Sequence, residues 1–156
     1  MKSCKYCIDT SALIEPWVRL YPPDVFPPVW KKLEELVGGG LLRAPMEVRR
    51  ELAKQSDGLY EWACSAEAMF IELDAAQALK AKEIVNAFPN LVKPNSTKSA
   101  ADPFVIALAE IAAVPVVTYE TKAKKTEAPK IPNVCEARGL RVISLVDVLR
   151  AESFRL

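Results

Sequence analysis

The chain has 156 residues, of which 51% are hydrophobic, and its 21 basic and 20 acidic side chains leave a formal net charge of +1. A chain of this length buries a substantial core without disulfides or structural metal, so we expect one domain over residues 1–156. The sequence has no histidine, which excludes Ser-His-Asp and Cys-His catalysis and the histidine-containing zinc sites. No apolar run approaches the ~18 residues of a membrane span, and Asp9 and Glu15 interrupt the first one before a signal-peptide core can form. We therefore expect a cytoplasmic protein that does not use a membrane.

The four cysteines include one Cys-x-x-Cys spacing, between Cys4 and Cys7, which is also found in zinc and redox sites. An odd offset of three within one strand points the two side chains to opposite faces, and no second pair at ligand spacing follows. We therefore expect free thiols.

Short apolar runs alternate with helical patterns along the whole chain. Strands are expected at residues 5–8, 41–44, 69–73, 114–119 and 141–144. Helices are expected at 12–20, 27–37, 46–54, 59–66, 75–88, 104–109, 134–138 and 145–151, the sixth being almost wholly apolar and therefore central. This alternation predicts the α/β class, as a three-layer α/β/α sandwich around a central, mostly parallel sheet of four to five strands.

Carboxylates recur at comparable places in this pattern. Asp9 and Glu120 each follow an apolar strand, Glu47 and Glu51 lie one turn apart in the helix after the second strand, and Asp102 precedes the central helix. Ligands bind beyond the carboxyl ends of the strands in open α/β sheets, so these acids could meet at one edge.

Each acid also has an ordinary structural explanation. Asp9 can belong to a turn before a helix that Thr10 and Ser11 cap, and Asp102 followed by proline is typical of an N-cap and first-turn pair. Glu47 and Glu51 can face solvent among basic neighbours.

Several carboxylates held close together raise one another's pKa values, an arrangement that a cation neutralises. Oxygen ligands suit the hard ions Mg²⁺ and Mn²⁺. Such ions generate a hydroxide nucleophile and stabilise charge on phosphate oxygens, which removes the need for histidine.

The acids lie in segments that resemble the successive acidic motifs of PIN domains. Those segments are YCIDTSALI at 6–14, VRREL at 48–52, ADPFVIALA at 101–109 and VVTYE at 116–120. The chain is most similar to an uncharacterised prokaryotic PIN-like subfamily, which it also resembles in residues 21–30 and 131–136.

The resemblance implies a metal-dependent endoribonuclease in which Asp9, Glu51, Asp102 and Glu120 hold Mg²⁺ or Mn²⁺ for cleavage of RNA. Glu47 is the alternative to Glu51 as the second acid. Ser11 matches a position that supports the first acid, and Thr118 matches the hydroxyl of the fourth motif. The fourth acid of the family is more often aspartate than glutamate.

Small single-domain PIN proteins often act as the toxin of a toxin–antitoxin pair. A small antitoxin protein and a second copy of the chain are therefore candidate partners beside the RNA substrate. Residues 121–130 carry four lysines and one glutamate directly after Glu120, and Lys122, Lys124 and Lys125 are candidates for contacts with phosphate. A solvated lysine-rich loop is the alternative explanation.

Two other functions fit part of the pattern. A non-catalytic PIN-like module would bind RNA or a protein without carboxylate-dependent uptake of metal. A phospho-acceptor domain of the response-regulator type would use Asp9 as its acceptor, although Asp9 lacks an acidic neighbour.

Overall fold

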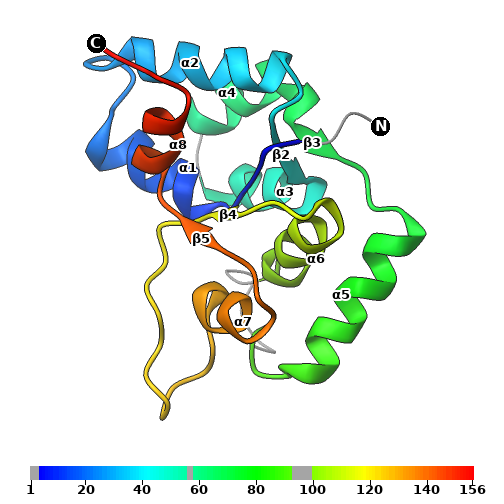
Figure 1. Cartoon of the computed structure of the whole chain (residues 1–156). Coiled ribbons are helices and arrows are strands. Elements are labelled where there is room, and N and C mark those ends of the chain that lie inside the picture. The colour runs from blue at the N-terminus through cyan, green and yellow to red at the C-terminus, as the bar shows by residue number, and fades with distance from the viewer. Residues whose placement is uncertain (1–3, 56–57, 93–99) are drawn as a thin grey trace.

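The computed structural model describes residues 4–55, 58–92 and 100–156. It contains a five-stranded sheet in the order β3-β2-β1-β4-β5, in which every neighbouring pair is parallel (Figure 1). The strands are β1 (Tyr6–Ile8), β2 (Leu42–Pro45), β3 (Phe70–Ile71), β4 (Val116–Val117) and β5 (Val142–Ile143). The predicted three-layer α/β/α fold with a parallel central sheet is confirmed.

Helices cover both faces of this sheet. They are α1 (Ser11–Glu15), α2 (Pro27–Gly38), α3 (Met46–Gln55), α4 (Gly58–Ser65), α5 (Ala75–Ala87), α6 (Asp102–Ala112), α7 (Ile131–Ala137) and α8 (Leu145–Ala151). A π-helical segment, Pro16–Leu20, continues α1, and a 3-10 turn, Glu67–Met69, precedes β3. Helices α2 and α8 lie on one side of the sheet, and α5, α6 and α7 lie on the other (Figure 1). Within the described ranges, none of the helices combines the length and apolar character needed to cross a bilayer.

The sequence located these elements well, with differences at their ends. Strands β3, β4 and β5 are each two residues long, shorter than the apolar runs that contain them. Helix α7 begins at Ile131 rather than at Val134, because the side chain of Asn133 accepts a hydrogen bond of 3.0 Å from the N-cap amide of Lys130. Pro132 suits this first turn, since proline has no N–H to leave unpaired.

The core surrounds β1 and α6. Every residue of β1 is buried, and α6 buries its residues from Val105 to Ala109. The central position predicted for this helix from its apolar sequence is therefore confirmed. Cys4, Cys7 and Cys135 are buried, Cys64 is half-buried, and all four cysteines are free.

The sheet order places a switch point between β1 and β4. From β1 the chain builds β2 and β3 on one side, and it then crosses to build β4 and β5 on the other. Helix α6 precedes the parallel strand β4, so it runs back along the sheet and begins at the carboxyl edge. Ligands of open α/β sheets bind at such a point. The order also differs from the 2-1-3-4-5 order of response regulators, which argues against the phospho-acceptor alternative.

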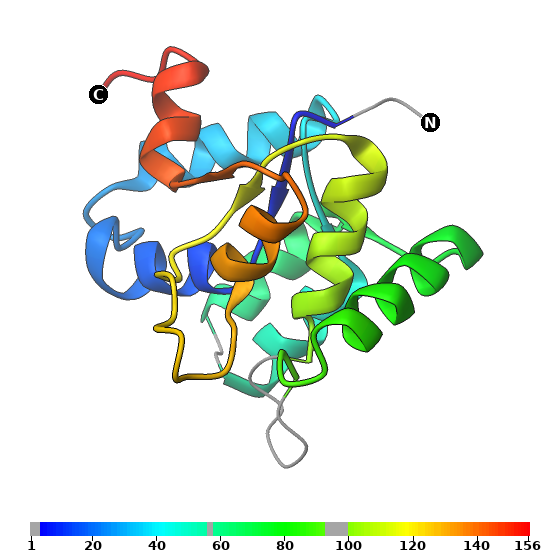
Figure 2. The same ribbon diagram turned by 60° about the horizontal axis from the view of Figure 1, so that its bottom comes forward.

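Figure 2 shows α6 and α7 in front of the sheet, and the segment that leaves β4 and returns to α7. We call residues 121–130 the basic arm.

Candidate metal centre

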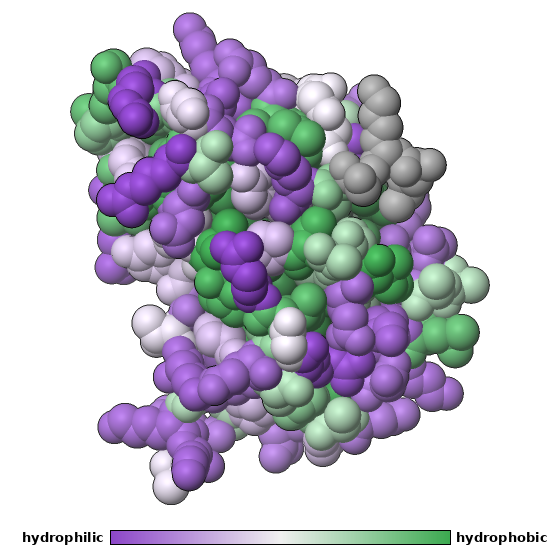
Figure 3. All heavy atoms as spheres, in the orientation of Figure 1, coloured by the Kyte–Doolittle hydropathy of each residue, from purple (hydrophilic) through white to green (hydrophobic). Residues whose placement is uncertain are grey.

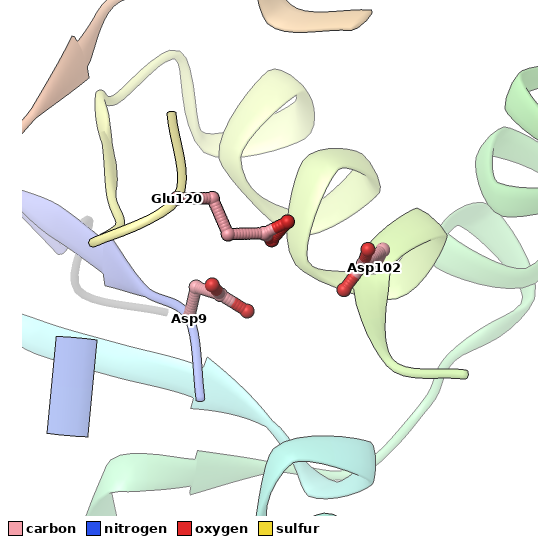
Figure 4. Close-up of side chains that lie close together, drawn as sticks. All are labelled: Asp9, Asp102 and Glu120. Atoms are coloured by element: carbon pink, nitrogen blue, oxygen red, sulfur yellow. The ribbon is translucent and has the colours of Figure 1, made fainter. Parts of the chain in front are cut away.

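Three acids from three elements converge at the switch point. Asp9 follows β1, Asp102 is the first residue of α6, and Glu120 lies three residues after β4. One carboxylate oxygen from each lies within 4.8 Å of the others. Their carboxylates point into one shared space (Figure 4). Asp9 and Asp102 are buried and Glu120 is half-buried, so the space lies largely away from solvent.

Two hydroxyls orient Asp9. Its Oδ2 accepts hydrogen bonds from Ser11 Oγ at 2.7 Å and from Thr118 Oγ1 at 2.9 Å. Ser11 Oγ also accepts from the Tyr119 amide at 3.0 Å, and Thr118 Oγ1 accepts from the Glu120 amide at 3.1 Å. Ser11, which was expected to support the first acid, therefore contacts it, and so does Thr118, the hydroxyl of the fourth motif. The two hydroxyls tie the turn that carries Glu120 to Asp9.

Glu51 reaches the same region from α3. Its side chain is buried, and its Oε1 accepts a hydrogen bond of 2.6 Å from Thr10 Oγ1. Its Oε2 is buried and has no hydrogen-bond partner within the part of the chain that is described. A buried carboxylate oxygen without a partner is costly unless a ligand satisfies it.

Thr10 is a site residue that the sequence assigned to a different task. It was expected to cap the helix after β1, and it does occupy the N-cap of α1, but its side chain makes no cap hydrogen bond there. Its hydroxyl instead donates to Glu51. The feature of the sequence that could have indicated this role is the position of Thr10 directly after the strand-end acid Asp9. A hydroxyl at that position can reach a carboxylate on the helix that follows the neighbouring strand.

Glu47 occupies a different environment from Glu51, although the two lie one turn apart. Its Oε2 forms an ion pair with Nη1 of Arg50 at 3.0 Å, whereas its Oε1, like Oε2 of Glu51, is buried without a hydrogen-bond partner in the described residues. Neither Glu47 nor Glu51 belongs to the cluster of three acids that share one space. The charge of Glu51, however, raises the pKa values of Asp102 and Glu120. The structure therefore brings Glu51 rather than Glu47 near the other three acids.

Asp102 does not act as the helix cap that its sequence suggested. The N-cap of α6 is Ala101, and Asp102 is already helical. Over the described ranges its carboxylate has no hydrogen bond, although the side chain is only 5% exposed. The capping alternative for this acid is thus wrong.

Burial and mutual repulsion raise the pKa values of these acids. Burial, followed by the charges of Asp9, Glu120 and Glu51, raises the pKa of Asp102 to about 10. Burial and the charge of Asp9 raise the pKa values of Glu51 and of Glu120 to about 7. Burial also raises the pKa of Asp9, against the hydrogen bonds from Ser11 and Thr118 that lower it. The arrangement opposes full ionisation at neutral pH, and a cation would relieve that opposition.

The donor set fits a hard divalent cation. Every candidate ligand is a carboxylate oxygen, the donor type that Mg²⁺ and Mn²⁺ prefer. The unpartnered Oε2 of Glu51 supplies a further buried acceptor at the same edge. No sulfur or imidazole competes within the acid cluster.

The basic arm presents only part of its charge to solvent. Lys122 forms an ion pair with Glu136, while Lys124 and Lys125 are exposed. Hydrophilic side chains cover the arm where it reaches the lower left of the molecule in the orientation of Figure 1 (Figure 3). Of the three lysines expected to contact nucleic acid, two are thus free of ion pairs in the described structure. Such lysines attract phosphate.

Residues 6–156 match the family described as "Domain of unknown function (DUF4411)". Because the match covers nearly the whole chain, the chain belongs to this family. No curated protein matches it. The family description names no activity.

Proposed function

We propose that this member of the DUF4411 family is a metal-dependent endoribonuclease of the PIN type, which cleaves RNA phosphodiester bonds with Mg²⁺ or Mn²⁺. The observation that carries the proposal is the convergence of Asp9, Asp102 and Glu120 within 4.8 Å at the switch point of the sheet. The buried, unpartnered oxygen of Glu51 is the second, independent indication of a ligand there.

Each residue has a task in this proposal. Asp9, Asp102 and Glu120 would hold the ion, with Glu51 beside them, and the ion would supply a hydroxide nucleophile and charge stabilisation at phosphate. Ser11 and Thr118 fix the rotamer of Asp9, and Thr10 fixes that of Glu51. Burial of the carboxylates keeps water away and strengthens their interaction with a cation. The exposed lysines of the basic arm, Lys124 and Lys125, draw the RNA backbone toward the site.

The proposed setting follows from the resemblance of the four acidic segments to PIN domains. In that setting the protein is a cytoplasmic toxin that a small antitoxin protein restrains, and it can pair with a second copy of itself. The four free cysteines fit a reducing compartment.

The test is RNA cleavage by the purified protein. Wild type is incubated with single-stranded RNA and Mn²⁺ beside Asp9→Asn and Asp102→Asn variants, with Glu47→Gln as a matched control for loss of an acid. We expect cleavage by wild type and by the control and none by the two site variants. Cleavage by wild type that is no greater than cleavage by the two site variants would overturn the proposal.

Calorimetric titration with Mn²⁺ distinguishes the proposed nuclease from the alternative, a non-catalytic module that binds RNA or a protein. An endoribonuclease of this type takes up Mn²⁺ through its carboxylates, whereas a binding module need not. Wild type that binds RNA but shows no heat of Mn²⁺ binding would favour the module.

A further inference from the structure

The two ends of the basic arm are held close together. Glu120, an acid of the candidate metal centre, directly precedes the arm, and Ile131, the first residue of α7, directly follows it. Backbone amides near both ends of the arm, those of Ala123 and Lys130, bind the same side chain in α7. The arm is therefore a closed loop that begins beside the candidate metal centre and returns to α7 (Figure 2).

One side chain closes this loop. Oδ1 of Asn133 accepts hydrogen bonds from the backbone amide of Ala123 at 2.9 Å and from that of Lys130 at 3.0 Å. Nδ2 of Asn133 donates to the carbonyl oxygen of Ala123 at 3.1 Å. A primary amide alone offers both an acceptor and a donor in this geometry. Ala123 is buried although its neighbours in the arm are exposed, so this tether holds the arm at one defined point.

The helix that carries Asn133 is itself fixed to the helix that carries Asp102. At the far end of α7, the guanidinium of Arg138 donates two hydrogen bonds, of 2.6 and 2.8 Å, to the carboxylate of Glu110 on α6. A bidentate pair of this kind fixes orientation as well as distance. Asn133 therefore connects the arm to a rigid part of the fold.

We propose that Asn133 is a positioning residue: its amide holds the basic arm closed beside the acids, so that the lysines of the arm contact the RNA backbone from one fixed place. The inference rests on the proposed function for its substrate class. It goes beyond that function because it makes one side chain outside the acid cluster responsible for the fixed conformation of the basic arm. Much of the affinity for RNA would then depend on that side chain.

The first experiment measures hydrogen exchange at the two backbone amides that Asn133 binds. Replacing Asn133 with Ala removes three hydrogen bonds, and we expect exchange at Ala123 and Lys130 to accelerate at least about tenfold. Exchange at Val148 in α8, outside this region, should stay unchanged. Asn86 of α5 is exposed, and Asn86→Ala serves as the matched control. Exchange at Ala123 and Lys130 within about twofold of wild type would overturn the inference.

The second experiment measures binding of a short single-stranded RNA in EDTA, which prevents metal-dependent cleavage. For Asn133→Ala we expect affinity to fall about three- to tenfold and the salt dependence of binding to become shallower, because a loose arm engages fewer phosphates. Asn133→Asp keeps both acceptor bonds to Ala123 and Lys130 and should recover most of the exchange protection. Faster exchange with unchanged RNA affinity and salt slope would overturn the inference.

These results stand apart from the proposed cleavage. A protein that fails to cut RNA, but shows the expected changes in exchange and in RNA binding, would refute the nuclease and leave the role of Asn133 intact. A protein that cuts RNA, but whose basic arm shows no change in hydrogen exchange on replacement of Asn133, would support the nuclease and refute the role of Asn133. Thermal melting of each variant identifies a general loss of folding, and in that case Asn133→Asp supplies the decisive comparison.

Discussion

Thr10 Oγ1 donates a hydrogen bond of 2.6 Å to Oε1 of Glu51, so the residue that follows the first strand-end acid holds the acid of the next crossover helix. This bond lowers the pKa of Glu51 against the burial that raises it to about 7. It also leaves Oε2 as the oxygen without a partner. Under the proposed function, Thr10 would thus prepare Glu51 to accept a cation.

Replacing Thr10 with Val should weaken metal binding. Without the hydroxyl the pKa of Glu51 rises further, and a proton competes with the ion for the carboxylate. We expect Mn²⁺ affinity at pH 7 to fall about tenfold, and the deficit to shrink at about pH 9, where Glu51 is ionised in both proteins. Calorimetric titration at the two pH values measures this. Thr10→Ser should retain wild-type affinity, and a Thr10→Val protein equal to wild type at pH 7 would refute the role of Thr10.

Glu51 and Glu47 offer a matched comparison on one helix. Glu51→Gln should lower Mn²⁺ affinity at least about tenfold, because it removes a negative charge beside the cluster of three acids. Glu47→Gln should change affinity less than about twofold, since the carboxylate of Glu47 pairs with Arg50. Metal titration of both variants decides which acid belongs to the site, and the reverse ranking would move the site toward Glu47.

Without metal, the protein should lose stability as the pH rises. The unfolded chain releases the protons of Asp102, Glu51 and Glu120 near about pH 4. The folded protein keeps them to about pH 7 at the two glutamates and to about 10 at Asp102. The contribution of these groups is therefore complete below the unfolded pKa values, and it is lost as the pH rises through the folded ones.

The measurement is urea denaturation in EDTA at about pH 5.5 and about pH 8.5, with a lower midpoint expected at the higher pH. Mg²⁺ should raise the midpoint at high pH more than at low pH, because it binds the ionised cluster. Asp102→Asn should reduce the difference between the urea midpoints at the two pH values. A midpoint in EDTA that is equal at both pH values, or higher at the alkaline one, would contradict the account.

Thr118→Val should destabilise the protein by about 1–3 kcal/mol, because it leaves the buried carboxylate of Asp9 with one donor fewer. For a chain of this size that loss lowers the melting temperature by about 2–4 °C per kcal/mol. Thr118→Ser keeps the hydroxyl and should recover most of the loss. Melting temperatures that do not differ between the Val and Ser variants would show that packing, rather than the hydrogen bond, is what Thr118 provides.

The sequence predicted the fold because its signals are local. Apolar runs and helical spacing locate nearly every element, and the alternation of the two implies a parallel sheet. The order of the strands could not be read in the same way, since pairing depends on contacts between distant segments. The helix start at Ile131 was missed because it depends on the side chain of Asn133, which also binds Ala123 ten residues earlier.

The candidate site was predicted in part. Strand ends indicated Asp9 and Glu120, but spacing alone left Glu47 and Glu51 equivalent, because residues four apart share a face. The choice between them depends on what each meets across space: Thr10 for Glu51 and Arg50 for Glu47. The same limit explains why Thr10 was assigned to a helix cap.

The central claim is that four acids hold a divalent metal ion, and anomalous scattering from a crystal soaked in Mn²⁺ tests it most directly. We predict a Mn²⁺ peak bounded by the carboxylates of Asp9, Asp102 and Glu120, with Glu51 beside it and Glu47 still paired with Arg50. A soaked crystal that binds Mn²⁺ elsewhere, with these carboxylates left without it, would contradict the account.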